Sequence, residues 1–314
     1  MIFQIDIPDL TAERCGNTGT PGVWHFDSGK PGSSVLLTAL IHGNELCGAW
    51  ALKDLLASGL VPRRGKLTLA FCNLAAFDRF NPQAHDTSRF VDEDLNRVWM
   101  TQKLSDSSTS ERQRAAELRP WVEQADYLLD LHSMHEPAPA LLVTGLLQRN
   151  IDLGLKLGVP RHLIVDAGHK DGTRMRDYAQ FGDPDGQALA LLVECGFHGD
   201  PSSIRVARQT AGRFLLASGI VDADGLPPEW TRQDDQDIAQ QVLQVTEPVV
   251  AKSANLSFAQ PWQGMECIER AGTVIGHDDG VPITTPYDHC VLVMPSLRQL
   301  VLGVTVVRFA RQVH

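Results

Sequence analysis

The chain has 314 residues, of which 43% are hydrophobic and 21% are charged, a balance typical of a soluble globular protein and not of a disordered or fibrous one. Its 28 lysines and arginines against 38 aspartates and glutamates give a formal net charge of −10, which argues against a general nucleic-acid-binding protein. An anionic substrate would therefore have to be attracted by a local cluster of arginines.

In the first two thirds of the chain, short apolar runs alternate with helical patterns, which predicts an α/β domain with a mostly parallel central sheet flanked by helices. In chain order we expect a strand at 35–41, a helix at 45–58, a strand at 67–72, a helix at 110–125 and strands at 127–131 and 188–193. Gly59 should end the first helix, and Ser110 with Gln113 forms a candidate capping box for the second.

The composition changes at residues 221–240, which are acidic, contain a Pro-Pro pair and show little apolar periodicity. We place a linker there. Beyond it, short β-rich runs punctuated by Gly and Pro predict a small all-β domain. The expected domains are an α/β domain over residues 1–230 and a β-rich domain over residues 231–314.

The chain also lacks the sequence features of membrane and secreted proteins. No stretch reaches the roughly 18 consecutive apolar residues of a membrane span. The N-terminus, with Asp6, Asp9 and Glu13, does not have the basic-then-apolar layout of a signal peptide. The six cysteines form no CxxC pair, which favours reduced structural thiols. We therefore expect a cytoplasmic protein with no membrane partner.

Two of the predicted strands end in histidine. The strand at 35–41 runs into His42-Gly43-Asn44-Glu45, and the strand at 127–131 runs into His132. Because ligand sites in open α/β sheets form at the carboxyl ends of strands, the HxxE spacing lets His42 and Glu45 point to one place that His132 reaches from another strand. Two neutral imidazoles and one carboxylate are the protein half of a catalytic zinc site whose fourth position is left to water.

A third predicted strand, at 188–193, ends at Glu194, whose carboxylate could accept a proton from such a water molecule if it lay within about 3 Å of it. Each of these residues alone is weak evidence, because a histidine at a strand end is more often a hydrogen-bonded structural residue. The case is stronger for the four together, since one pocket could gather residues from separate strand ends.

The stretches ALIHGNELCGAWAL, SRFVDEDLNRVW, LLDLHS and LLVECG, in this order, resemble the succinylglutamate desuccinylase and aspartoacylase family, which is related to the zinc carboxypeptidases. The resemblance covers residues of about 35 to 200 well and the β-rich C-terminal part more loosely. It implies a zinc carboxypeptidase-like catalytic domain that holds one Zn²⁺ per chain through His42, Glu45 and His132.

The resemblance also implies roles for polar residues around the metal. Arg89 matches the arginine that polarises the scissile carbonyl, and Asn96 with Arg97 matches the pair that holds a substrate carboxylate. Glu194 matches the general base and proton shuttle. We interpret Asp94 as an acid that orients an arginine or the adjoining backbone.

Two further substrate-binding residues of the family have no unique match. Arg174 or Arg176 is a candidate for an arginine upstream of the general base, and Tyr287 is a candidate for a tyrosine of the C-terminal domain. The alternative is that both arginines lie in a polar loop and that Thr-Pro-Tyr-Asp forms a β-turn.

These features predict the hydrolysis of the amide bond of a small anionic N-acyl amino acid. The alternatives are a metallocarboxypeptidase that acts on a peptide or cell-wall fragment and a non-catalytic metal- or ligand-binding homologue. We read the β-rich domain as a capping or assembly module that narrows access to the metal, which favours a small substrate. The intact Arg89 and Glu194 argue against a non-catalytic protein. The sequence does not disclose the acyl group, the amino acid or the oligomeric state, and a homo-oligomer remains open.

Overall fold

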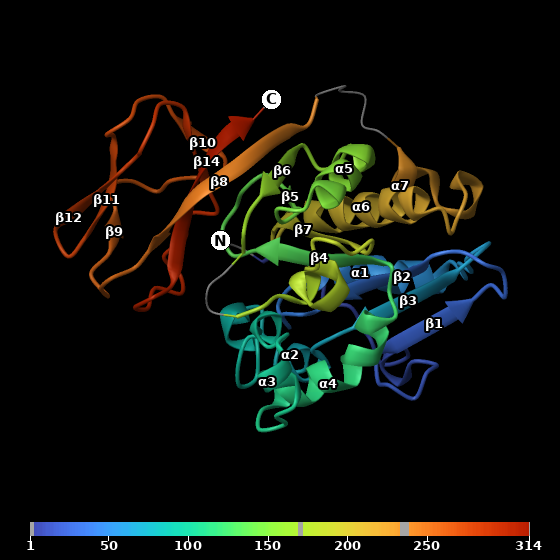
Figure 1. The fold of residues 1–314 in the computed structure, drawn as a ribbon. Coiled ribbons are helices and arrows are strands. Elements are labelled where there is room, and N and C mark those ends of the chain that lie inside the picture. Colours follow the sequence, from blue (N-terminus) through green and yellow to red (C-terminus); the bar gives the residue numbers. More distant parts are fainter. Residues whose placement is uncertain (1–2, 169–171, 233–238, 314) are drawn as a thin grey trace.

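A large sheet of eleven strands runs through the molecule (Figure 1). The structure is a computed structural model that describes residues 3–168, 172–232 and 239–313. The strand order is β1-β3-β2-β4-β7-β5-β6-β8-β14-β13-β10. The strands of the α/β part are β1 (Val23–Asp27), β2 (Ser34–Ala39), β3 (Lys66–Phe71), β4 (Tyr127–Met134), β5 (Leu141–Val143), β6 (His162–Val165) and β7 (Leu189–Phe197).

The sheet is mixed, which corrects the expectation of a mostly parallel one. Within the described residues, five of its strand pairings are parallel and five are antiparallel. The antiparallel pairings involve β1, the three-residue β5 and the C-terminal strands. A parallel strand that is buried on both faces is recognised by a long apolar run, and none of these strands has one. The sequence pattern therefore did not reveal the antiparallel pairings.

Helices cover both faces of the α/β part of the sheet (Figure 1). One face packs against α1 (Leu46–Ala57), α5 (Gln148–Leu157) and α6 (Ser202–Ser218), with α7 (Pro228–Thr231) against α6. The other carries α3 (Thr101–Leu104) and α4 (Ser110–Glu123), whereas Phe77 of the single turn α2 (Leu74–Phe77) belongs to the same core as α1 and α6. Neighbouring residues of β2 accordingly belong to different cores, since Leu37 packs on the α1 and α6 side and Leu36 on the α4 side. Burial on both faces explains why this strand reads as a continuous apolar run.

All six predicted elements of the α/β part are present, with shifted ends. Gly59 follows α1 at φ +68°, and its N–H donates to Leu56, as expected of a helix stop. The proposed capping box is wrong by one residue, because the cap of α4 is Thr109, whose Oγ1 accepts from the N–H of Arg112. Both β4 and β7 extend past their predicted ends, so His132 and Glu194 lie within strands rather than after them.

The C-terminal part is β-rich, as expected, and most of it extends the large sheet. Its strands are β8 (Gln241–Val250), β9 (Ser257–Phe258), β10 (Glu266–Ile268), β11 (Val274–Asp278), β12 (Val281–Thr284), β13 (Cys290–Val293) and β14 (Thr305–Val313). The strand β8 pairs in parallel with β6, and β14 then pairs with β8. A separate three-stranded sheet has the order β12-β11-β9 and lies at the far end (Figure 1).

The expected linker is only partly visible, because its residues 233–238 lie outside the described ranges. Its described portion includes the single turn of α7. Within the described residues, we find no helix with both the length and the apolar character needed to cross a membrane.

Candidate metal centre and active site

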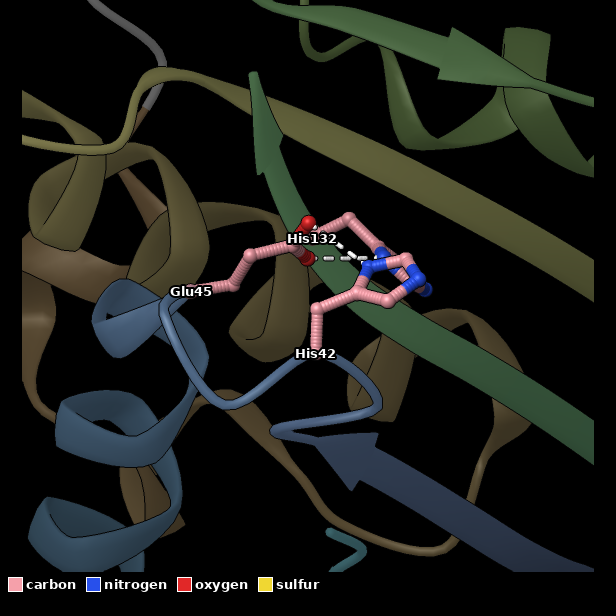
Figure 2. A group of neighbouring side chains, drawn as sticks. All are labelled: His42, Glu45 and His132. Atoms are coloured by element: carbon pink, nitrogen blue, oxygen red, sulfur yellow. Dashed lines mark hydrogen bonds and ion pairs between the residues drawn. The ribbon is translucent and has the colours of Figure 1, made fainter. Parts of the chain in front are cut away.

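Three buried side chains converge at one end of the sheet and form a group that could hold a metal ion (Figure 2). Their candidate ligand atoms all lie within 4.8 Å of one another. Glu45 stands at the N-cap position of α1 without a capping hydrogen bond, and its carboxylate lies between the two imidazoles. Its Oε1 is 2.7 Å from Nδ1 of His42, and its Oε2 is 2.8 Å from Nδ1 of His132. Both rings therefore turn the same nitrogen, Nδ1, toward the glutamate.

Each histidine is held at its other nitrogen by a second carboxylate. His42 Nε2 lies 3.0 Å from Asp94 Oδ1, and His132 Nε2 lies 2.7 Å from Asp130 Oδ2. The second oxygen of Asp130 accepts a hydrogen bond from Thr38 Oγ1 at 2.7 Å. A carboxylate at Nε2 fixes the ring proton there and leaves the Nδ1 lone pair for a cation. This donor set fits a divalent metal ion.

In the metal-free protein, the pKa values of Glu45 and His132 are shifted in the directions that favour positive charge at this site. Burial opposes ionisation of Glu45, but His42 and His132 hold the pKa of its carboxyl well below the ordinary value. Burial likewise opposes a charge on His132, yet Asp130 and Glu45 raise its pKa well above the ordinary value. The group thus binds a proton tightly where a cation would bind, and metal loading must release that proton.

Glu194 lies beside the metal group, because it is paired in register with His132 across β4 and β7. Burial and the neighbouring Glu45 carboxylate raise its pKa to about 8, although His132 and Arg89 oppose the shift. Its Oε2 is buried without a hydrogen-bond partner among the described residues. A carboxyl group poised near neutral pH, with an oxygen available for a proton, suits acid–base chemistry.

Arg89 reaches the metal group from the loop before α3. Its Nη2 donates to Asp94 Oδ2 at 3.1 Å, and its Nη1 lies 3.5 Å from Glu45 Oε1 and 3.3 Å from His135 Nε2. Asp94 also accepts the backbone N–H of Asn96 at 2.7 Å. Burial opposes its ionisation, but His42 and Arg89 hold the pKa of Asp94 well below the ordinary value. The ionised Asp94 carboxylate thus contacts both His42, a candidate metal ligand, and Arg89, a candidate catalytic residue.

The metal group, Glu194 and Arg89 open into one cavity of about 200 Å³, which Asn96, Arg97 and Arg174 also line. Asn96 is buried, and its Oδ1 accepts from the backbone N–H of Met175. Arg174 is 5% exposed, and its Nη2 has no hydrogen-bond partner in the described part of the chain.

Arg308 of β14 lines the same cavity and pairs with the buried Asp166 at 3.2 Å. Burial and the cations Arg89, Arg174 and Arg308 lower the pKa of Arg97, although Asp94 opposes this. The arginines are therefore close enough to repel one another, and an anion would relieve that repulsion.

Two candidates from the sequence lie apart from this cavity. Arg176 is 1% exposed and uses its guanidinium within the fold, donating to the carbonyl oxygens of Thr144 and Ala190 and to Asp177. Tyr287 lies in the C-terminal part, where its hydroxyl is 2.7 Å from Thr246 Oγ1. Neither side chain is among the cavity's lining residues.

Sequence reasoning missed three residues of the site. Asp130 stands two positions before His132 in a strand, and since residues two apart share a face, the Asp-x-His spacing is a signal that could have identified it. His135, three residues past His132, contacts Arg89. Arg308 carries no local signal, because it reaches the cavity only through the pairing of β14 with β8.

Comparisons with known proteins agree with the resemblance. Residues 31–184 match the model of the succinylglutamate desuccinylase/aspartoacylase catalytic domain. A protein named succinylglutamate desuccinylase from Pseudoalteromonas atlantica is 25% identical over 310 residues, covering 88% of this chain and 81% of that protein.

Solved structures share the fold. A succinylglutamate desuccinylase from Vibrio cholerae has a TM-score of 0.65 at 14% identity, covering 93% of this chain and 86% of that one. A succinylglutamate desuccinylase/aspartoacylase from Rhodobacter sphaeroides has a TM-score of 0.64 at 19% identity, covering 91% and 87%. The product-bound ectoine utilization protein EutE (DoeB) from Ruegeria pomeroyi has a TM-score of 0.62 at 16% identity, covering 90% and 86%. Residues 31–184 therefore form a succinylglutamate desuccinylase/aspartoacylase catalytic domain, and the named relative and the common fold agree with this assignment.

Proposed function

We propose that the protein is a zinc-dependent deacylase that hydrolyses the amide bond of a small anionic N-acyl amino acid. The observation that carries the proposal is the presence, in one cavity, of the His42, Glu45 and His132 group with Glu194 and Arg89 beside it. Two imidazole nitrogens and one carboxylate suit zinc better than magnesium or calcium, which prefer oxygen ligands.

Bound zinc supplies the Lewis acidity that makes water a nucleophile near neutral pH. Glu194 accepts the proton of that water at its carboxylate and delivers it to the nitrogen of the leaving amine. Arg89 donates to the carbonyl oxygen as negative charge develops there, while Asp94 holds the other edge of its guanidinium. The amide C–N bond breaks, and a carboxylic acid and a free amine leave.

The arginine cluster supports an anionic substrate. Arg97, Arg174 and Arg308 line the cavity. The acidic residues among its described lining are Glu45 of the metal group, Glu194 beside it, and Asp166, which pairs with Arg308. A guanidinium can grip a carboxylate with two parallel hydrogen bonds, and partial burial strengthens such a pair. The names of the relatives, a succinylglutamate desuccinylase and an ectoine utilization protein, agree with small polar substrates.

The small cavity favours a deacylase over the metallocarboxypeptidase alternative. Residues of the C-terminal part, among them Val293, Met294 and Gln299, line it together with the metal group. A peptidase needs an open groove for the residues on the amine side of the bond. A non-catalytic role is disfavoured by Glu194, since burying an ionisable acid without a partner costs free energy.

The decisive experiment is an activity screen of the zinc-loaded protein against a panel of N-acyl amino acids, with release of free amine as the readout. His132→Ala should lose most of its zinc by elemental analysis, because only two protein ligands remain. Glu194→Gln should keep its zinc and lose about 10²- to 10⁴-fold in turnover. Release of C-terminal amino acids from peptides, with no activity on the panel, would favour the carboxypeptidase instead.

A further inference from the structure

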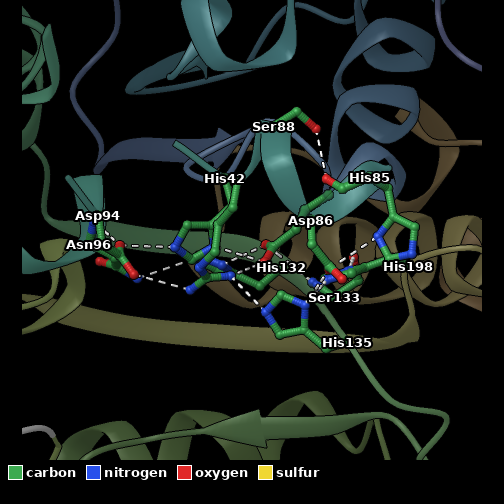
Figure 3. A network of polar contacts seen from close by, with 12 residues as sticks. His42, His85, Asp86, Ser88, Asp94, Asn96, His132, Ser133, His135 and His198 are labelled. Atoms are coloured by element: carbon green, nitrogen blue, oxygen red, sulfur yellow. Dashed lines mark hydrogen bonds and ion pairs between the residues drawn. The ribbon is translucent and has the colours of Figure 1, made fainter. Parts of the chain in front are cut away.

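We propose that His135 is a positioning residue for Arg89 and that Asp86 holds its imidazole in the tautomer that this task requires. The inference rests on the proposed function, in which Arg89 faces the reacting carbonyl. It concerns a cluster of polar side chains next to the metal group, among them Asp86, Ser133, His135 and His198 (Figure 3).

The contact between Arg89 and His135 determines the proton position on the histidine. Arg89 Nη1 lies 3.3 Å from His135 Nε2. A guanidinium has only donors, so Nε2 must be the unprotonated acceptor. A neutral ring then carries its proton on Nδ1, and this nitrogen lies 3.1 Å from Asp86 Oδ1, which can only accept when ionised. Asp86 and Arg89 thus select the same tautomer from opposite edges of the ring.

The surroundings keep the ring neutral and in place. Burial, opposed by Asp86 and assisted by the Arg89 cation, lowers the pKa of His135. His198 lies against the Nδ1 edge of the His135 ring, with its Nε2 3.3 Å from His135 Nδ1. The other ring nitrogen of His198, Nδ1, lies 2.8 Å from Ser133 Oγ. Burial also lowers the pKa of His198 well below the ordinary value. The proton on His135 Nδ1 therefore faces two acceptors, Asp86 and a neutral His198.

Asp86 also accepts a hydrogen bond from the C-terminal part of the chain. Arg298, in the loop between β13 and β14, donates to Asp86 Oδ2 at 3.3 Å and to Glu136 Oε1 at 2.8 Å. A chain of contacts therefore runs from Arg298 through Asp86 and His135 to Arg89. Through this chain, the β-rich part would help set the orientation of an arginine in the cavity.

His135 prevents a competing position of Arg89. The guanidinium is held at Nη2 by Asp94 and at Nη1 by His135, while Glu45 Oε1 lies only 3.5 Å from Nη1. Without the imidazole, Nη1 would pair more closely with Glu45 and turn away from the carbonyl. Small misplacements of a catalytic group cost up to about 100-fold in rate.

The test is a comparison of variants by kinetics in the zinc-loaded protein. His135→Ala should lower kcat by about 10- to 100-fold with KM and zinc content close to wild type. His135→Gln, which can offer an oxygen to Arg89, should restore part of the loss. The matched control is His25→Ala, which removes another partly buried histidine. His25 lies on β1 and contacts Thr68 on β3, so its removal should leave kcat unchanged.

A double-mutant cycle separates positioning from general damage. In an Arg89→Met background, His135→Ala should cause little further loss, because there is no guanidinium left to orient. Fully additive losses would overturn the proposal. So would a large rise in KM or a loss of zinc in His135→Ala.

Nitrogen chemical shifts of the His135 ring supply a readout that needs no activity. We expect a protonated Nδ1 and an unprotonated Nε2, and the opposite tautomer would overturn the inference. A second bound metal ion on this cluster would also overturn it, since an ion at Nδ1 must displace the proton. If no N-acyl amino acid is hydrolysed but the tautomer is as expected, the proposed function fails and the contact between His135 and Arg89 stands.

Discussion

Replacement of Asp130 by asparagine should weaken zinc binding by about 10- to 100-fold, although Asp130 is not a ligand. The side chain is fully buried, with Oδ1 2.7 Å from Thr38 Oγ1 and Oδ2 2.7 Å from His132 Nε2. Oδ1 accepts from Thr38, and the ionised Oδ2 lies close enough to Nε2 to favour the proton of His132 on that nitrogen, so that its Nδ1 lone pair faces Glu45 and the proposed ion.

An asparagine has only one acceptor oxygen to divide between these two partners. If its NH₂ faces His132, the ring must carry its proton on Nδ1, which is the wrong tautomer for a metal ligand. If its NH₂ faces Thr38, the threonine hydroxyl must turn to the carbonyl oxygen of Leu129, 3.4 Å away, and a neutral oxygen then polarises the ring less than a carboxylate did. Either arrangement weakens binding, and the expected change corresponds to about 1.4–2.8 kcal/mol.

The assay is a competition titration against a zinc-chelating indicator near neutral pH, with circular dichroism to confirm the fold. Thr38→Val is the matched control, because it removes one hydrogen bond of Asp130 and leaves the carboxylate on His132. Its zinc affinity should stay close to wild type. An unchanged Kd in folded Asp130→Asn, or an equal loss in Thr38→Val, would refute the tautomer argument.

Three further predictions concern charged side chains in and beside the cavity. In metal-free protein the folded-state pKa of Glu194 is about 8, above the ordinary 4.5, so the folded state binds more protons between these values. The free energy of unfolding should therefore fall as the pH rises through this window, and the fall should be smaller in Glu194→Gln when both are measured by denaturant unfolding. Arg97→Met should mainly raise KM, because a carboxylate contact is nearly equal in the ground and transition states, whereas Arg89→Met should lower kcat by about 10²- to 10³-fold. Amidation of the substrate carboxylate should lower the activity of the wild type far more than the activity of the Arg97→Met variant. If the losses from amidation and from Arg97→Met are additive, Arg97 does not touch that carboxylate. Arg176→Met should destabilise the fold by about 3–5 kcal/mol in denaturant titrations, because it leaves two buried carbonyls without their donor and removes one of the two arginines that pair with Asp177, whereas Arg174→Met, which leaves Arg176 on Asp177, should mainly change KM.

Much of the metal group was predictable from local sequence. His42 and Glu45 are three residues apart at a strand-to-helix junction, and His132 follows an apolar run, so alternation and short-range spacing suffice to place all three at one end of the sheet. The six predicted elements were found for the same reason, since their apolar periodicity is continuous over many residues.

The mixed character of the sheet was not predictable in this way. Strand direction depends on which neighbour a strand pairs with, and β5 has only three residues, all apolar, which fit a parallel or an antiparallel position equally well. Its antiparallel pairing with β7 is decided by the surrounding packing.

The polar residues around the metal group likewise include some that local sequence predicts and others that only the packing of the fold places. Arg174 and Arg176 stand two residues apart in one loop, yet one lines the cavity and the other donates to buried backbone carbonyls. Arg308 and Asp166 are far apart in the chain and meet because β8 lies between β6 and β14. Short-range pattern therefore predicts the elements and places the candidate metal group and Glu194 at neighbouring strand ends. Which arginines line the cavity, and how Asp130 and His135 contact their partners, depends on strand order and on buried hydrogen-bond geometry, which local pattern does not carry.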